Sequence, residues 1–450
     1  MNSNIAKTLN YLKKNGLIKT IYAVKERMSE NSQAEYIYTP VSEEEKKNQV
    51  NISKEYTTKV SILVPTYETK PQFMEALIDS VLAQTYGCWE LVLADASKSD
   101  IVKDTVKKYT DDRIKYVRLH SNLGISGNSN AAIEHCTGEY TGLLDHDDIL
   151  TENALYEMAR CIENSKKSDC SLKMIYSDED KMNAEGTVFF DPNIKPDFNL
   201  QLLLSNNYIC HFLVLETKLL KNLEFRKEYD GAQDHDLVLR AVSKLMEEYP
   251  ASYRRCIGHV AKVLYHWRSH ENSTAQNPQS KQYAYESGKR AVQDFVDSQK
   301  WNGKVTDTEH MGFFRVDFTP DIFTCRKEVA AVGGRIIGKG GRVIDGIYDE
   351  NQAVMFEGLN KHHSGGILHR AACQMEVPFI NIQNMLISED VKPEFENIIK
   401  KHENDMNPDY KAISVEFCDE MKKKGYVFTY DPQMTVKKKN VQNYFGNTKH

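Results

Sequence analysis

Three aspartates stand close together after an apolar stretch, in the segment "YTGLLDHDDIL" at residues 140–150. Side chains alternate along a strand, so Asp145 and Asp147 are expected to point the same way. Two such carboxylates repel each other unless a cation lies between them, and oxygen ligands suit Mg²⁺ or Mn²⁺. The alternative is that Asp147 and Asp148 favour the dipole of a following helix. That alternative leaves Asp145 unexplained.

A second acidic group stands in "GAQDHDLVLRAVSKLMEE". Leu237, Val238 and the apolar residues that follow at helical spacing predict a helix that begins near Gln233 or Asp234. Asp234 then lies in the first turn, where a carboxylate either caps the helix or is free to act as a general base. Asp236 is the neighbouring candidate for the same role.

These groups need elements that position them, and residues 59–150 alternate short apolar runs with helical patterns. The pattern predicts strands at 60–67, 89–95, 114–119 and 140–145, with helices between them. Such alternation specifies parallel strands joined by right-handed crossovers. Ligands of such sheets bind beyond the carboxyl ends of the strands, where Pro65, Thr66, Tyr67, Glu68, Asp95 and the three aspartates are expected.

The length of 450 residues allows two or three domains. The net charge of −6 and the lack of a basic stripe argue against nucleic acid as a partner. Nine scattered cysteines without a C-x-x-C pair argue against a zinc or disulfide framework, so a reducing cytoplasm is expected. The sequence contains no run of about 18 apolar residues, so no membrane-spanning helix is expected.

Residues 1–58 differ from the rest and are predicted to form a basic helical segment followed by a polar linker, "SEEEKKNQVNISKEY". The helix has two interpretations. It either docks on the body of the protein, or rests as a basic amphipathic helix on an anionic membrane surface. The second would place the protein peripherally on the inner face of the plasma membrane.

Several motifs occur in one order: "VSILVPTYE", "WELVLADAS", "SNLGISGNSNAA", "TGEYTGLLDHDDIL", "IYSDEDKM", "GAQDHDLVLR" and "LYHWRSHENSTA". Together they resemble glycosyltransferase family 2, with the GT-A fold, in its bacterial cell-surface polysaccharide form. The resemblance implies an α/β fold with a mostly parallel central sheet, helices on both faces and a catalytic domain at 59–300. It is expected to be a hexosyl- or rhamnosyltransferase type of enzyme.

The resemblance also implies roles for matching positions. Pro65, Thr66, Tyr67, Glu68 and Asp95 would bind the nucleotide, and Asn130 would help shape that side. Asp145 and Asp147 match the family's metal and diphosphate motif, with Asp148 adjacent. Many relatives have an arginine before the asparagine, where this chain has Ser129. A contact made there in relatives is therefore expected to be missing.

The same resemblance implies the catalytic side of the site. Asp234 becomes the expected base, with Gln233 in place of the usual glutamate. His266 becomes a metal ligand, although a lone histidine is more often structural. Arg268 becomes a clamp on diphosphate oxygens. Ser273 and Thr274 would lie on a loop that closes over the donor.

Two further regions carry expectations. The acids Asp178, Glu179 and Asp180 are interpreted as a turn on a solvated edge, bordering the sugar side by resemblance. The glycine-rich "VGGRIIGKGGRVIDG" is predicted to form two strands joined by a turn at Lys339 to Gly341. Residues 318–440 resemble a degenerate second GT-A domain that lacks the nucleotide half and forms a smaller α/β region.

The sequence therefore predicts a metal-dependent, inverting glycosyltransferase. Its donor would be a UDP- or dTDP-linked sugar, its cofactor Mn²⁺ or Mg²⁺, and its acceptor a glycan or a lipid-linked sugar of capsule, O-antigen or wall synthesis. The alternative is a non-catalytic sugar-nucleotide-binding or scaffold protein. A pyrophosphorylase is disfavoured because "PTYETKPQ" is not a glycine-rich basic loop.

Overall fold

The computed structural model of this protein describes residues 12, 16–17, 20–22, 24, 36–167, 171–269, 278–362 and 365–445. The chain divides into two units. The unit that contains most of the predicted catalytic domain, hereafter the catalytic unit, comprises Glu35–Phe198 and Asn207–Gln299. The carboxyl-terminal unit comprises Lys300–His450 with Asn199–Asn206 and Met1–Ala34.

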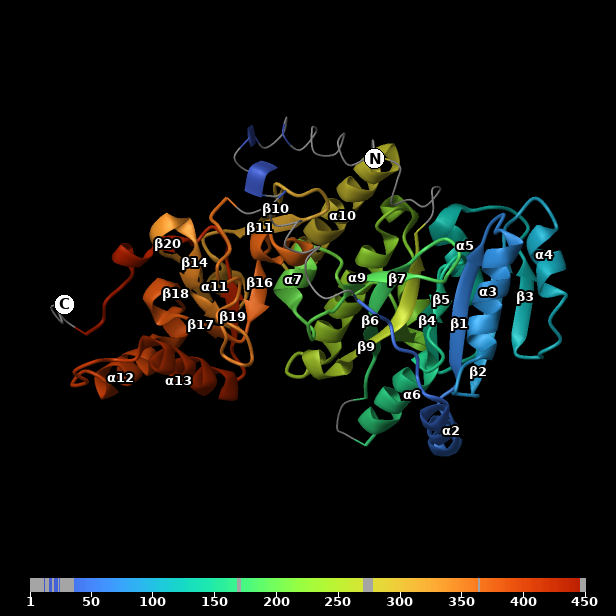
Figure 1. Ribbon diagram of the computed structural model, residues 1–450, viewed down its shortest axis with the longest axis horizontal. Helices are drawn as coiled ribbons and strands as arrows, with labels where there is room; N and C mark the ends of the chain where they lie inside the picture. Colours follow the sequence, from blue (N-terminus) through green and yellow to red (C-terminus); the bar gives the residue numbers. More distant parts are fainter. Residues whose placement is uncertain are drawn as a thin grey trace. The chain divides into compact units, whose positions relative to one another are not determined.

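One mixed sheet is the centre of the catalytic unit (Figure 1). Its strand order is β3-β2-β1-β4-β8-β6-β9-β5, with β7 paired to β6. The pairs among β3, β2, β1 and β4 are parallel, and so is β6 with β9, which confirms a mostly parallel sheet. The bounds are β1 Val60–Thr66, β2 Trp89–Asp95, β3 Ile114–Arg118, β4 Tyr140–Leu143, β5 Ile149–Leu150, β6 Met174–Met182, β7 Phe189–Asn193, β8 Leu213–Glu216 and β9 Ile257–Arg268.

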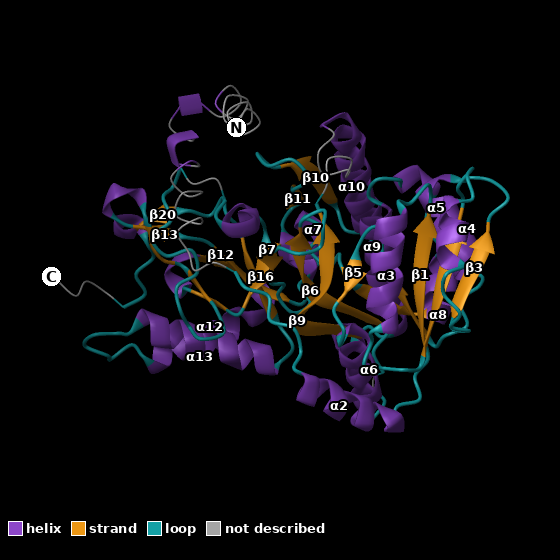
Figure 2. Ribbon diagram, turned by 45° about the vertical axis from the view of Figure 1, so that its right-hand side comes forward, coloured by secondary structure: helices purple, strands orange, loops and turns teal. Residues whose placement is uncertain are grey.

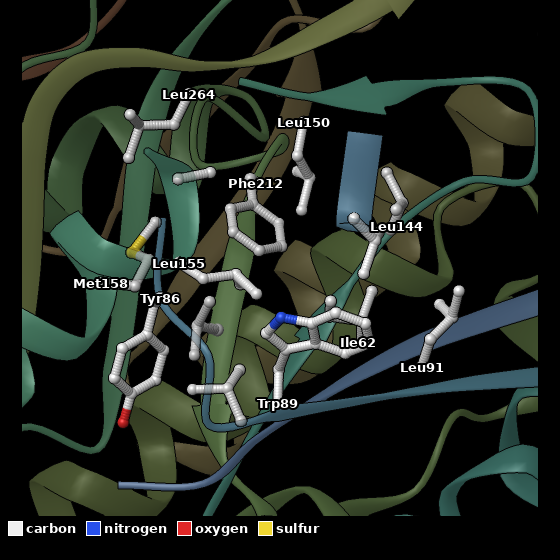
Figure 3. Packing of buried hydrophobic residues seen from close by; sticks show 14 of the residues in the cluster. Ile62, Tyr86, Trp89, Leu91, Leu144, Leu150, Leu155, Met158, Phe212 and Leu264 are labelled. Carbon is white, nitrogen blue, oxygen red and sulfur yellow. The ribbon is translucent and has the colours of Figure 1, made fainter. Parts of the chain in front are cut away.

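Helices cover both faces of this sheet (Figure 2), as a parallel sheet buried on both sides requires. Alternate residues of β1, such as Ile62 and Val64, belong to a core that also contains Leu77. Figure 3 shows Ile62, Leu155 and Phe212 in this core. The helices of the unit are α2 Glu43–Ile52, α3 Pro71–Leu82, α4 Ile101–Val106, α5 Gly124–Ile133, α6 Ala154–Ser165, α8 Thr217–Leu223, α9 Gln233–Glu248 and α10 Pro278–Ser298.

The polar stretch predicted as a linker is instead helix α2. Ser42 caps it by accepting a hydrogen bond from the Glu45 backbone at 3.2 Å, and three glutamates follow in the first turn. Acids there favour the helix dipole, a local signal that a reading based on polarity alone missed. The predicted basic amino-terminal helix lies largely outside the described residues, so its two interpretations stay predictions.

The carboxyl-terminal unit is built from small sheets, ordered β16-β19-β12-β18, β14-β13-β20, β10-β11 and β15-β17. The predicted glycine turn is confirmed: β13 pairs antiparallel with β14, and Gly340 has φ +80°. The bounds are α7 Leu200–Ser205, β10 Gly303–Asp307, β11 Phe314–Phe318, α11 Ile322–Cys325, β12 Val329–Gly333, β13 Ile336–Ile337, β14 Val343–Asp345, β15 Ile347–Tyr348, β16 Met375–Val377, β17 Phe379–Ile380, β18 Met385–Ile387, α12 Lys392–Lys401, α13 Tyr410–Lys423, β19 Val427–Tyr430 and β20 Val436–Lys437.

The predicted catalytic domain, residues 59–300, included the segment of helix α7. In the structure this helix packs within the carboxyl-terminal unit instead. Asn199 exchanges two hydrogen bonds with the backbone of Glu376, at 2.8 and 2.9 Å. Arg326 donates to Gln201 at 2.7 Å. Every residue of α7 is buried. A segment from the middle of the catalytic sequence is thus held by residues more than a hundred positions later.

Truncation after about Trp301 is therefore expected to lower solubility sharply. The deletion would expose the leucines of α7 and leave Gln201 without Arg326, and buried polar groups cost free energy when unpaired. The measurement is the soluble fraction and the binding of a hydrophobic dye. A truncated protein that stays soluble and monomeric and does not bind the hydrophobic dye would contradict this expectation.

Candidate active site

The predicted nucleotide side is assembled at the ends of β1 and β2. The Asp95 carboxylate is fully buried and accepts hydrogen bonds from the Ser97 backbone at 2.9 Å and the Tyr116 hydroxyl at 2.7 Å. Arg118 donates to it at 3.0 Å, and the Thr66 hydroxyl lies 3.3 Å away. Sequence reasoning missed Tyr116 and Arg118, which fix Asp95 from the neighbouring strand β3.

Glu68 joins two loops at this edge of the sheet. Its carboxylate accepts hydrogen bonds from the Ser99 hydroxyl at 2.6 Å and from the backbones of Ser99 and Lys98, at 3.1 and 2.7 Å. The bond from the Ser99 hydroxyl, with the others, lowers the pKa of Glu68. The Pro65 ring next to this loop is half-buried and the Tyr67 side chain is exposed.

Asn130 makes a contact other than the predicted one. Its amide nitrogen donates to the carbonyl of Phe225 at 2.8 Å, and its oxygen accepts from the Phe225 backbone at 2.7 Å. This two-way bond ties helix α5 to the chain that follows α8. The structure therefore gives Asn130 a scaffold contact, and its part in shaping the nucleotide side stays a prediction.

The three aspartates after β4 are placed differently from one another. The Asp145 side chain is 56% exposed, and its Oδ2 lies 3.8 Å from Nε2 of His211. Asp148 is fully buried and accepts hydrogen bonds from the Tyr265 hydroxyl and, at 2.7 Å, from the Arg268 backbone. Burial, then the charges of Asp147 and Asp145, raise the pKa of Asp148 well above its usual range. Asp148 is therefore engaged in the scaffold, and Asp145 is the accessible carboxylate.

Arg268 holds the aspartate loop in place. Its Nε donates to the carbonyl of Asp147 at 2.6 Å and its Nη1 to the carbonyl of Ala184 at 2.7 Å. The side chain is 2% exposed and stacks over Phe73 at 4.8 Å. These contacts use the guanidinium inside the protein, so the structure does not present it as the predicted diphosphate clamp.

His266 is likewise enclosed. Its Nδ1 lies 2.5 Å from Asp180, and its ring contacts Tyr38 and Phe189 with centroids 4.5 and 4.2 Å away. Tyr36, two residues before Tyr38, donates a hydrogen bond to the same Asp180 at 2.8 Å. The extended chain before α2 thus covers His266, which differs from the predicted role as a metal ligand.

The acids predicted on a solvated edge are instead buried in the central strand β6, so that prediction is wrong. Each has a histidine partner: Asp178 with His259 at 2.9 Å, Glu179 with His211 at 3.2 Å, and Asp180 with His266 at 2.5 Å. Charged groups are buried only when such partners compensate the loss of water. The partners come from distant segments, which no local pattern reveals.

His211, a residue that sequence reasoning missed, is held in position by Glu179. Glu179 accepts from the backbone and ring of His211, and Lys195 donates to Glu179 at 3.1 Å and to the carbonyl of Ile209 at 2.9 Å. The His211 ring stacks on Tyr265 at 4.9 Å. Burial opposes protonation, but Glu179 and Asp145 raise the pKa of His211 to about 9.

Asp234 lies at the first turn of α9, as predicted, and Gln233 donates to it at 3.2 Å. Burial and the charge of Asp145 raise the pKa of Asp234 to about 6, while His211 opposes that rise. Asp145, His211 and Asp234 therefore form one electrostatically connected group. Asp236 does not join it, because Arg226 and Arg240 hold its carboxylate in ion pairs.

The predicted metal ligands can be compared with what a divalent cation requires. In the part of the chain described here, no three His, Cys, Asp or Glu residues are grouped to hold a metal by themselves. Asp145 and Asp147 still fit Mg²⁺ or Mn²⁺, which bind one or two carboxylates and take other oxygens from substrate phosphates and water. Asp148 and His266 do not fit, since protein donors and rings already surround them. The loop with Ser273 and Thr274 lies outside the described residues.

The larger unit is an α/β domain in which Asp95 and the aspartates after β4 stand at the carboxyl ends of parallel strands. Residues 61–223 match the family described as Glycosyl transferase family 2. The predicted resemblance to this family is therefore confirmed, for a region that includes the strand ends and the aspartate motif.

Curated relatives include proteins named for O-antigen biosynthesis and for glucosyl transfer. The chain is 29% identical over 253 residues to O-antigen biosynthesis protein RfbC of Myxococcus xanthus, covering 55% of this chain and 19% of that protein. It is 31% identical over 169 residues to UDP-Glc:alpha-D-GlcNAc-diphosphoundecaprenol beta-1,3-glucosyltransferase WfgD of Escherichia coli, covering 37% of this chain and 63% of that protein. The chain thus spans less than two thirds of the length of these relatives.

A solved structure that resembles this one is S. aureus TarS 1-349 in complex with UDP-GlcNAc. The identity is 19%, the TM-score 0.42, and the match covers 53% of this chain and 66% of that one. No helix in the described ranges is both long and apolar enough to cross a membrane.

Proposed function

We propose that this protein is a metal-dependent, inverting glycosyltransferase that moves a sugar from a nucleotide diphosphate to a glycan or lipid-linked acceptor of the cell surface. The observation that supports the proposal best is that Asp145 lies 3.8 Å from His211 and that the charges of both act on the Asp234 carboxylate. The activity for which the relative WfgD is named favours a UDP-linked hexose as donor. The cytoplasmic location predicted from the cysteines belongs to the same proposal.

The residues divide the work of the reaction between two sides. Thr66 and Asp95 lie where the nucleotide base would bind, and Asp145 and Asp147 face the diphosphate. A divalent ion held there would act as a Lewis acid toward the leaving group. On the other side, the Asp234 carboxylate takes the proton of the acceptor hydroxyl. The hydroxyl oxygen then attacks the anomeric carbon as the diphosphate leaves, which inverts the configuration.

A thermal-shift screen of nucleotide sugars with and without Mn²⁺ tests this function. A ligand that binds the folded state raises its stability by RT ln(1 + [L]/Kd), so the true donor should give the largest metal-dependent shift. Product formation with that donor separates an enzyme from a scaffold protein. A protein that binds donors but never transfers or hydrolyses them would contradict the proposal.

Asp147→Asn is expected to weaken UDP binding in Mn²⁺ by about tenfold or more, or about 1.4 kcal/mol. An amide is a poorer ligand than a carboxylate for a hard cation. Calorimetry with Mn²⁺ and with EDTA measures the effect. Asp191→Asn is the matched control, because its ion pair with Lys181, at 3.2 Å, lies on the surface. Equal UDP affinity of the unaltered protein in EDTA and Mn²⁺ would refute the metal assignment.

A further inference from the structure

The carboxyl-terminal unit contains a polar pocket that the family match at 61–223 does not reach. The pocket has a volume of about 390 Å³ and lies beside the β10–β11 hairpin. Thr306 and Arg315 face each other across this hairpin. Ala371, Ala372 and Pro432 add small apolar surfaces. All lining residues belong to one unit, so the shape of the pocket is internal to it.

The polar wall of this pocket is held rigidly. Arg315 donates two hydrogen bonds to Asp431, both at 2.7 Å, and a third to Asp317 at 2.5 Å. Gln374 is 6% exposed and accepts from the Val316 backbone at 3.1 Å. Side chains fixed in this way lose little conformational entropy when a ligand binds, so the wall is preorganised.

The charges around the pocket are balanced. Three cationic lining residues, Arg315, Arg335 and Lys361, stand against three anionic ones, Asp307, Glu309 and Asp317. A phosphate-rich ligand would need an excess of positive charge, and a nucleobase would need an aromatic ring to stack on. No lining residue is aromatic. Nucleotides are therefore disfavoured.

A ligand with many hydroxyl groups can form hydrogen bonds with both the cationic and the anionic residues of this lining. Each sugar hydroxyl both donates and accepts hydrogen bonds, so it pairs with the guanidinium and ammonium groups and with the carboxylates. The volume falls within the range of small-molecule sites, about 300–1,000 Å³, at its lower end. That is room for one sugar ring and part of its neighbour. The small apolar residues leave space for the carbon face of the ring.

We propose that this pocket binds a carbohydrate residue and so holds a glycan on the carboxyl-terminal unit. Its lining residues belong to a different unit from the aspartates, and the proposal assigns the pocket no part in bond transfer. The inference therefore stands or falls independently of the proposed transferase activity.

The test measures sugar binding to the full chain by saturation-transfer NMR and calorimetry. The probes are methyl glycosides of glucose, galactose, N-acetylglucosamine, rhamnose and glucuronic acid, with maltotriose and chitotriose. At least one probe is expected to bind. Ala372→Leu should weaken that binding by about tenfold or more, because leucine fills the pocket. Ala412→Leu is the control, since Ala412 is exposed on α13 outside the pocket.

Lys361→Gln gives a second variant should Ala372→Leu lower the unfolding temperature, because Lys361 is exposed and forms no ion pair with any described residue. It should weaken binding of the glucuronoside most. The proposal is overturned if no probe binds, or if binding survives both variants. It is also overturned if the bound sugar is lost in Asp145→Asn instead, or if UMP binds with the same sensitivity to Ala372→Leu.

Discussion

Asp234→Asn is expected to slow sugar transfer by about 10²–10⁴-fold while leaving donor affinity nearly unchanged. The amide keeps the size of the side chain and the contact with Gln233, but it cannot accept a proton from the acceptor hydroxyl. The measurement is turnover under saturating donor, alongside calorimetric donor binding. Near-normal turnover in this variant would remove Asp234 from the mechanism.

The pH profile gives an independent check of the same residue. The folded pKa of Asp234 is raised to about 6, and a general base must be deprotonated to work. Activity should therefore be full above this value and fall as the pH drops through about 6. Asp234→Asn should lose this limb of the profile. Asp236→Asn is not an equivalent test, because breaking its ion pairs with Arg226 and Arg240 would destabilise α9.

Lys195→Met is expected to lower the free energy of unfolding by about 3–5 kcal/mol, because it removes the buried ammonium partner of the Glu179 charge and leaves His211 alone to balance it. The Lys195 side chain is 0% exposed and that of Glu179 is 10% exposed. Urea unfolding measures the loss. Lys107→Met is the control: Lys107 pairs with Asp104 at 3.0 Å on an exposed surface, where a pair contributes about 0–1 kcal/mol.

The double variant Lys195→Met, Glu179→Gln separates the charge from the packing. Removing the orphaned carboxylate should recover part of the lost stability, and no recovery would show that the charge was not the cause. The pH dependence has a defined sign. Although burial would raise it, Lys195 and His211 lower the pKa of Glu179 to about 2. Its contribution is thus present above about pH 4 and is lost as the pH falls toward 2.

His211 contacts both the buried Lys195–Glu179 pair and Asp145 of the candidate active site. Lys195 donates to the His211 carbonyl, Glu179 contacts the His211 backbone and ring, and the His211 Nε2 lies 3.8 Å from Asp145. Lys195→Met should for that reason also reduce turnover, whereas Lys107→Met should not. A variant that unfolds more easily but transfers sugar at the normal rate would show that the pair serves the fold alone.

Much of this protein follows from local sequence. The strand "WELVLAD" is β2 from Trp89 to Asp95 as predicted, and the first four strands pair in parallel because apolar runs alternate with helical segments. The order of elements also places Asp145 and Asp95 at the carboxyl ends of strands. Asp234 at a helix start follows from the spacing of Leu237 and Val238. These features depend on neighbours a few residues away, which the sequence displays directly.

Only the tertiary structure decided what each polar group does. Asp148 and the Arg268 backbone are 120 positions apart, and Asn130 and Phe225 are 95 apart. Asp178, Glu179 and Asp180 have the composition of a surface turn, yet histidines from other elements allow their burial. Helix α7 lies in a different unit from the sequence around it. Pairings over such distances depend on which strands and loops become neighbours, and a charged residue looks the same in sequence whether water or a buried partner surrounds it.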